Sequence, residues 1–136
     1  MDYDSLCERH EYLIVEGIGG LLVPIDEYYF VVDLANETEL PVIVVCRPNL
    51  GTINHTLLTV SYAREHGLDV KGIIMNESTE KCDYVLKKTN ADEIKRLTNL
   101  PILGMIPFDK RLDVTKFNKE VLLEIFRDNI DKDIII

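Results

Sequence analysis

Four short runs of mostly β-branched residues recur along the chain at intervals of about thirty residues. They are Tyr12–Val15, Val42–Cys46, Val70–Met75 and Ile102–Ile106. An interval of this length holds one strand, a crossover helix and two loops. A run such as Val42–Cys46 does not alternate with polar residues, which indicates a strand that is covered on both faces. The sequence therefore predicts an α/β fold with a parallel sheet flanked by helices.

The segment after the second run begins and ends with residues that are typical of helix termini. Asn49–Thr52 supplies turn and N-cap residues, and His66-Gly67 closes the helix that follows. The residues expected on one apolar face of this helix are Ile53, Leu57, Leu58 and Tyr62. This segment is predicted to be an amphipathic helix.

Three further segments are expected to be helical. One extends from Lys81 to Thr98, with Asn90 as a possible break between two pieces. Another occupies residues 1–10 and is rich in acidic side chains, and a terminal one is indicated by Val121, Leu122, Ile125 and Phe126. Predicted helices thus separate the second run from the third and the third from the fourth, as parallel strands require.

Length and composition bound the domain organisation and the class of partner. The chain has 136 residues, 46% of them hydrophobic, which predicts a single α/β domain over residues 1–136, either whole or part of a larger fold. The net charge of −9 argues against a sequence-independent grip on nucleic acid, which needs clustered Lys and Arg. No apolar run is long enough to cross a bilayer, so no membrane association is expected.

The cysteines indicate the compartment. Cys7, Cys46 and Cys82 are odd in number, far apart in sequence and without metal-ligand spacing. This pattern fits a reducing compartment and predicts neither a disulfide framework nor a zinc site. Because no signal peptide is recognisable, we expect a cytoplasmic location.

The first run ends in a lone carboxylate, Glu16, followed at once by Gly17, Gly19 and Gly20. A strand that delivers an acid to its tip, next to residues without a Cβ, suits a phosphate and Mg²⁺. The alternative is a tight turn with Glu16 in solvent. The stretch is neither the G-x-G-x-x-G fingerprint nor the G-x-x-x-x-G-K-[ST] phosphate loop, and no part of the chain matches the latter.

Other candidate residues follow the remaining strands, at the edge where parallel sheets bind their ligands. Thr52 opens a helix whose N-terminal amides could bind a carboxylate, a phosphate or only water. Asn76 could read a purine edge or simply make a turn, and Pro107-Phe108 could flank a base or be an ordinary loop. His55 could titrate near neutrality or cap and pack its helix.

In combination and order, five segments resemble the C-terminal half of dethiobiotin synthetase. The Leu-Gly-x-Ile-Asn-His pattern is the most specific of them, and the resemblance covers about residues 10–110. The segments are Glu16–Pro24, Leu40–Val45, Asn49–Thr59, Gly72–Asn76 and Leu103–Pro107. The resemblance implies a P-loop NTPase-like fold that lacks its N-terminal part in this chain.

The resemblance further implies an ATP- and Mg²⁺-dependent cyclo-ligase of biotin synthesis. Its substrates would be 7,8-diaminopelargonic acid and CO₂, and its product the ureido ring of dethiobiotin. Carried over by position, Glu16 would bind Mg²⁺, Gly17, Ile18 and Gly19 would line the phosphates, and Asn76, Pro107 and Phe108 would hold the adenine. Leu50, Gly51, Thr52 and Asn54 would hold the carboxylate of the diamine across a homodimer interface. No catalytic residue is assigned to this chain.

The departures from the family concern the parts that contact the γ-phosphate. The phosphate loop with its Lys and Thr, a further Lys and a second Mg²⁺-binding Asp have no counterpart in these 136 residues. Three hypotheses follow: part of a ligase whose missing half is elsewhere, for example on a separate chain; a regulatory or nucleotide-binding module; or a catalytically inactive, dimerising remnant of the fold. Cobyrinic acid diamide synthase-like amidoligases share the sheet, but the Leu-Gly-x-Ile-Asn-His pattern is not their signature.

Overall fold

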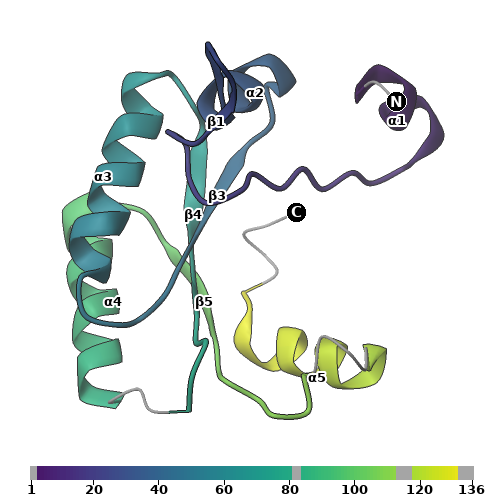
Figure 1. Cartoon of the computed structure of the whole chain (residues 1–136). Coiled ribbons are helices and arrows are strands. Elements are labelled where there is room, and N and C mark those ends of the chain that lie inside the picture. Colours follow the sequence, from purple (N-terminus) through teal and green to yellow (C-terminus); the bar gives the residue numbers. More distant parts are fainter. Residues whose placement is uncertain (1–2, 81–83, 113–117, 132–136) are drawn as a thin grey trace.

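The computed structural model describes residues 3–80, 84–112 and 118–131. Its centre is a three-stranded parallel sheet of order β3-β4-β5, formed by Val42–Cys46, Val70–Asn76 and Ile102–Ile106. Helices α3 (Thr52–Glu65) and α4 (Tyr84–Thr98) connect these strands and cover one face of the sheet (Figure 1). Because the crossover connections between parallel strands are right-handed, helices that follow strands added in one direction lie on the same face. The predicted parallel sheet with flanking helices is confirmed.

The remaining elements surround this unit. Helix α5 (Lys119–Asn129) contacts β5 and lies on the other side of the sheet from α3 and α4 (Figure 1). Helix α1 (Tyr3–Arg9) buries none of its residues. A small hairpin of β1 (Pro24–Asp26) and β2 (Tyr29–Phe30) leads into α2 (Val31–Thr38). The helices at residues 1–10 and around 121–126 were expected, whereas the hairpin and α2 were not.

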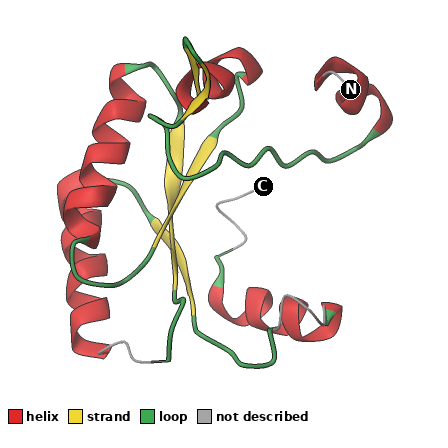
Figure 2. Ribbon diagram, in the orientation of Figure 1, coloured by secondary structure: helices red, strands yellow, loops and turns green. Residues whose placement is uncertain are grey.

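The predicted strand at Tyr12–Val15 is wrong. These residues form an irregular segment, drawn as loop in Figure 2, and the side chains of Tyr12 and Ile14 are 83% and 93% exposed. A strand exists only where a neighbour completes its hydrogen bonds. Among the described residues none pairs with this segment. The apolar pattern therefore predicts a buried strand that the structure does not form.

The core lies between the sheet and helices α3 and α4. Its largest fully buried side chains include Ile73 and Met75 on β4 and Ile94 on α4. Of the apolar face expected on α3, Ile53 and Tyr62 pack half-buried against the core, which confirms them, whereas Leu58 is 62% exposed and does not belong to this face. The residues that α3 buries are Thr52, Thr56, Val60 and Ala63. These are smaller side chains, which allow a helix to approach a sheet closely.

The break expected at Asn90 is also wrong, because α4 runs unbroken through it. The Asn90 side chain is buried and its Nδ2 donates a hydrogen bond to the carbonyl oxygen of Pro48 at 3.2 Å. A buried amide is tolerated inside a helix when it finds such a partner. Asn90 thus joins α4 to the loop after β3. Lys81, where the helix was expected to begin, lies outside the described residues.

Two further observations concern membrane-spanning helices and cysteines. In the described part of the chain, no helix has the length and apolar character needed to cross a membrane. Cys7 is an exposed free thiol and Cys46 a half-buried one, while Cys82 lies outside the described residues.

An ion pair fixes the end of β4 to α4. Lys87 on α4 contacts Glu77, and the two side chains are only 14% and 9% exposed. The backbone N–H of Glu77 also donates to the carbonyl oxygen of Ile106 at 3.0 Å, which joins the ends of β4 and β5. This pair is therefore a structural clamp on the edge of the sheet where the candidate residues lie.

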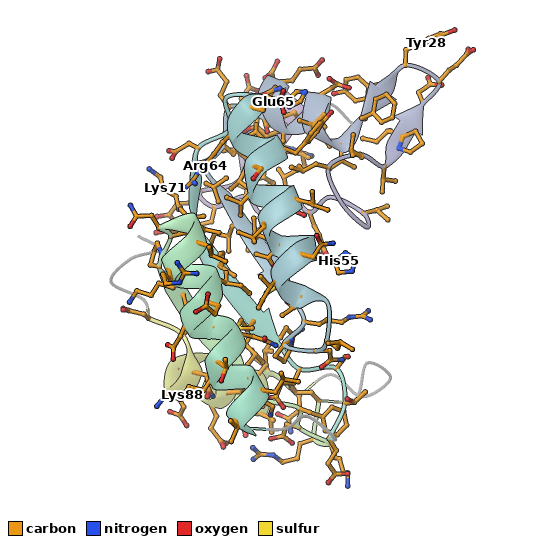
Figure 3. All side chains as sticks on the ribbon, turned by 90° about the vertical axis from the view of Figure 1, so that its left-hand side faces the viewer. Tyr28, His55, Arg64, Glu65, Lys71 and Lys88 are labelled. Carbon is orange, nitrogen blue, oxygen red and sulfur yellow. The ribbon has the colours of Figure 1, made fainter. Side chains whose placement is uncertain are left out.

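We predict that Lys87→Met lowers the free energy of unfolding by about 3 kcal/mol, because it leaves the carboxylate of Glu77 shielded and unpaired. The matched control is Lys88→Met on the exposed neighbouring position of α4 (Figure 3), which should change stability little. The double variant Glu77→Gln/Lys87→Met should recover part of the loss, since no lone charge remains. Urea unfolding at neutral pH measures all three. Equal stability of the Lys87 and Lys88 variants would contradict the clamp.

Candidate functional site

The parallel register brings three strand ends to one edge of the sheet. Cys46 pairs with Met75, and Asn76 pairs with Ile106, so β3, β4 and β5 end side by side. The loop after β3, the side chain of Asn76 and Pro107 therefore lie along the same edge, as the sequence predicted.

A groove of about 1430 Å³ lies between the irregular segment Leu13–Gly17, strand β3 and helix α3. Five of the predicted site residues line it, namely Glu16, Gly17, Gly19, Leu50 and Thr52. The other predicted residues are not part of its lining, and these are Ile18, Gly51, Asn54, Asn76, Pro107 and Phe108. The structure thus brings Glu16 and Thr52 to one groove, with the predicted adenine-contacting residues outside it.

The N-terminus of α3 faces this groove without a side-chain cap. The N-cap residue is Gly51, whose φ of 90° is a left-handed conformation that glycine adopts without strain. Thr52 is therefore the first helical residue, and the N-cap lies within Asn49–Thr52, as the sequence predicted. Its backbone N–H donates to the carbonyl oxygen of Asn49 at 3.1 Å. An uncapped N-terminus carries partial positive charge and favours an anion.

Two hydroxyl groups at this helix end are buried without a hydrogen-bond partner among the described residues. They are Thr52 Oγ1 and Thr56 Oγ1, in side chains that are 6% and 1% exposed. A buried hydroxyl without a partner costs free energy, and such a group calls for an explanation, for example a ligand. Thr56 was not a predicted site residue, although its spacing of four from Thr52 places both on one helix face.

The charge around the helix end suits an anionic group. Arg47 and His55 also line the groove, and both are exposed. His55 projects from α3 on the side away from α4 (Figure 3). Its ring lies over Gly51, where an added Cβ would be 3.4 Å from Cδ2. A cationic side chain, an imidazole and a helix N-terminus thus surround the same space.

The glycine segment has a packing explanation at one position. A Cβ on Gly17 would lie 2.6 Å from Cγ1 of Val31, so a larger residue would collide with α2. Gly19 has a φ of 79°, and Gly20 donates its N–H to the carbonyl oxygen of Ile18 at 3.0 Å. The segment is a tight glycine turn whose first residue is required by the fold.

Glu16 is the acidic side chain that this groove offers to a cation. Its carboxylate is exposed, and in the described ranges no three His, Cys, Asp or Glu side chains gather as a metal site. Mg²⁺ commonly takes one or two carboxylates together with water and substrate phosphates. Glu16 therefore fits one shared Mg²⁺ ligand and does not make a metal site by itself.

The loop after β5 is held by a second charged group. Arg111 contacts Asp109 at 2.7 Å and Glu124 of α5 at 3.1 Å, which ties the loop to that helix. The side-chain and backbone hydrogen bonds from Arg111 lower the pKa of the Asp109 carboxyl. The neighbouring side chains of Pro107 and Phe108 are exposed, the latter by 38%. A fixed apolar surface is thus presented next to Asn76.

Residues 2–116 match the sequence model of a family described as AAA domain. The chain belongs to this AAA domain family. With the parallel sheet, this membership confirms the predicted α/β, P-loop NTPase-like fold.

Several curated proteins named ATP-dependent dethiobiotin synthetase BioD are similar to the chain. The protein of Bacillus cereus (strain B4264) is 44% identical over 94% of this chain and 51% of its own length. That of Bacillus subtilis (strain 168) is 45% identical over 95% and 53%, and that of Thermodesulfovibrio yellowstonii 39% over 98% and 57%. The predicted resemblance is confirmed. The chain spans about half the length of the curated relatives it matches.

We predict that Asp109→Asn makes stability less dependent on acid pH. A carboxyl with a lowered folded-state pKa stabilises the fold above its ordinary value of 3.8, and this contribution disappears as the pH falls through the lower folded-state pKa. Between about pH 6 and pH 3, the unfolding midpoint in urea should therefore fall more for the unmodified chain than for the variant.

The control for this measurement is Asp92→Asn, which removes an exposed carboxylate from α4. It should keep the acid dependence of the unmodified chain. If Asp109→Asn behaved in the same way, the ion pair with Arg111 would make no contribution to the folded state.

Proposed function

We propose that this chain forms part of an ATP-dependent dethiobiotin synthetase. In the proposed reaction, CO₂ adds to one amine of 7,8-diaminopelargonic acid to form a carbamate. ATP phosphorylates this carbamate and leaves as ADP, and the second amine then closes the ureido ring with release of phosphate. Support comes from the name that the relatives share and from the groove at α3. Such a reaction depends on positioning a phosphoryl group and two amines. The residues that bind the substrates would therefore contribute most of the rate enhancement.

The observation that carries the proposal is the uncapped N-terminus of α3 with its unpartnered hydroxyl. The carboxylate of the diamine would accept hydrogen bonds from the backbone N–H groups of Ile53 and Asn54, and from Thr52 Oγ1 once binding uncovers it. Arg47 lies beside the same groove and adds positive charge. The ligand would thus satisfy a polar group that the free protein leaves unpaired.

The remaining residues fit the nucleotide and the metal. Glu16 would share Mg²⁺ with the phosphates, and the turn at Gly17–Gly19 would approach them through its backbone. Asn76 would hydrogen-bond the adenine, with Pro107 and Phe108 against its face. These three residues lie outside the groove of Glu16, so an extended ligand would have to cross the end of the sheet.

The γ-phosphate contacts would come from elsewhere. No G-x-x-x-x-G-K-[ST] motif occurs in the sequence, and the chain matches only about half of each relative. A separate chain could supply the phosphate loop, and a homodimer would complete the diamine site. The proposal is therefore of a ligase that needs a second polypeptide portion.

Calorimetric titration with the diamine and with Mg·ATP separates the hypotheses. Diamine binding, with weak or absent binding of Mg·ATP, supports the proposed ligase part. Binding of Mg·ATP alone would favour a nucleotide-binding module. Binding of neither would leave a remnant of the fold, and both of these results contradict the proposal.

We predict that Thr52→Val raises the dissociation constant of the diamine by about tenfold or more, because it removes a hydrogen bond to a charged group. The same change should leave the free energy of unfolding unchanged or raise it, because it removes an unpaired buried hydroxyl. The matched control is Thr59→Val, further along α3, whose hydroxyl already donates to the His55 carbonyl oxygen at 2.9 Å. Titration and urea unfolding measure both variants. Equal diamine affinity in the two would refute the role of Thr52.

A further inference from the structure

Asn76 is the last residue of β4, and the proposed function gives it contact with the nucleobase. Its side chain is exposed, and its backbone pairs with Ile106 of β5. The side-chain amide offers an acceptor oxygen and a donor nitrogen, so contact with a base edge through both requires a fixed direction. The ends of strands open more easily than their centres. Recognition of a base by Asn76 therefore depends on what holds this strand end.

The following residue, Glu77, holds the strand end through two contacts. Its backbone N–H donates to the carbonyl oxygen of Ile106 at 3.0 Å, and its carboxylate forms the ion pair with Lys87 of α4. Helix α4 begins beside this end of β4 (Figure 1). Because successive side chains of a strand point to opposite faces, a Glu77 directed toward α4 turns Asn76 to the other face. The contact between Lys87 and Glu77 thus sets the direction of Asn76.

This ion pair differs from the others in how well it is shielded from water. Its side chains are 14% and 9% exposed, whereas every other ion pair of the described residues has a partner that is more than half exposed. A shielded ion pair is rarely more stable than apolar side chains of the same size, because both charges lose their water. Net stability therefore does not explain the pair. What the pair supplies is a directional contact between two elements.

The loops next to this strand end have weaker contacts. Lys110 in the loop after β5 contacts Glu80 in the loop after β4 at 2.9 Å, with side chains that are 71% and 67% exposed. An exposed ion pair of this kind contributes little to stability. Arg111 ties the loop after β5 to α5 and not to β4. Among the described residues, the shielded contact at the end of β4 is therefore that of Lys87.

We propose that Lys87 is a positioning residue for the nucleobase. Through its ion pair with Glu77 it holds Asn76 in the direction that adenine requires, without touching the base itself. Adenine presents an amino group beside a ring nitrogen, and an asparagine amide held in one direction bonds both. An amide that is held before the ligand arrives loses less entropy on binding. The identity of the ligand rests on the proposed function, whereas the contact of Lys87 with the strand end does not.

The first test is hydrogen exchange of the free chain. In Lys87→Met, the backbone N–H of Glu77 should exchange at least about tenfold faster than in the control Lys88→Met, because the strand end opens locally. The N–H of Val42, which donates to the carbonyl oxygen of Asp69 at 2.8 Å at the opposite end of the sheet, should be unaffected. Equal exchange of Glu77 in the two lysine variants, or equal acceleration at Glu77 and Val42, overturns the proposal.

Adenosine, which carries no phosphate, tests the consequence for the base. Titrated into the unmodified chain, it should shift the NMR signals of Asn76. Lys87→Met should raise the dissociation constant of adenosine by about threefold or more, because the amide is no longer held in advance. Lys87→Arg keeps a cation that can pair with the carboxylate of Glu77, and it should retain the affinity.

The double variant Glu77→Gln/Lys87→Met separates positioning from stability. It leaves no lone charge and should regain part of the stability that Lys87→Met loses. It still lacks the directional contact with α4, so it should bind adenosine as weakly as Lys87→Met does. Recovery of both stability and adenosine affinity would make the role of Lys87 purely structural and overturn the proposal.

Neither measurement involves the diamine, so the two proposals can fail separately. Adenosine that leaves the signals of Asn76 unchanged overturns the role of Lys87 and leaves the proposed diamine site untouched. Adenosine affinity that depends on Lys87, in a chain that does not bind the diamine, refutes the proposed function and supports the role of Lys87.

Discussion

Parallel pairing of β4 with both of its neighbours is the constraint on which the rest of the structure depends. Ile73 and Met75 of β4 are completely buried, and both edges of the strand are used by β3 and β5. Because all three strands point the same way, their ends and the loops that follow them share one edge. The helix end at Thr52, the side chain of Asn76 and the surface of Phe108 owe their common location to this ladder.

The sequence predicts those parts of the fold that are decided locally. The strands at Val42–Cys46 and Ile102–Ile106 and the helix beginning at Thr52 agree with the structure because apolar runs and turn residues mark them directly. The run at Tyr12–Val15 carries the same signal and forms no strand. Strand formation needs a partner, and the identity of a partner is not encoded in the run itself.

Side-chain roles were harder to predict, for the same reason. Asn90 is of a residue type that often interrupts helices. Its hydrogen bond to the carbonyl oxygen of Pro48 nevertheless keeps it inside α4. A glycine at position 17, directly after an acid, suggests a phosphate-binding residue. The close contact with Val31 already explains why only glycine fits there. The position of Thr52 at a helix end that faces the groove was predictable, whereas its burial and the companion hydroxyl of Thr56 depend on how α3 packs against the sheet. The chemical roles of the site residues stay predictions.

The buried hydroxyls of α3 have a consequence for how this protein can change. Valine has nearly the shape of threonine and carries no polar atom, so selection for thermal robustness alone would favour it at position 52. Threonine at this position lowers the free energy of unfolding of the free protein, and a carboxylate bound to its hydroxyl would offset that loss. Under the proposed function, binding of the diamine would therefore raise the thermal stability of the chain as well as occupy the first turn of α3.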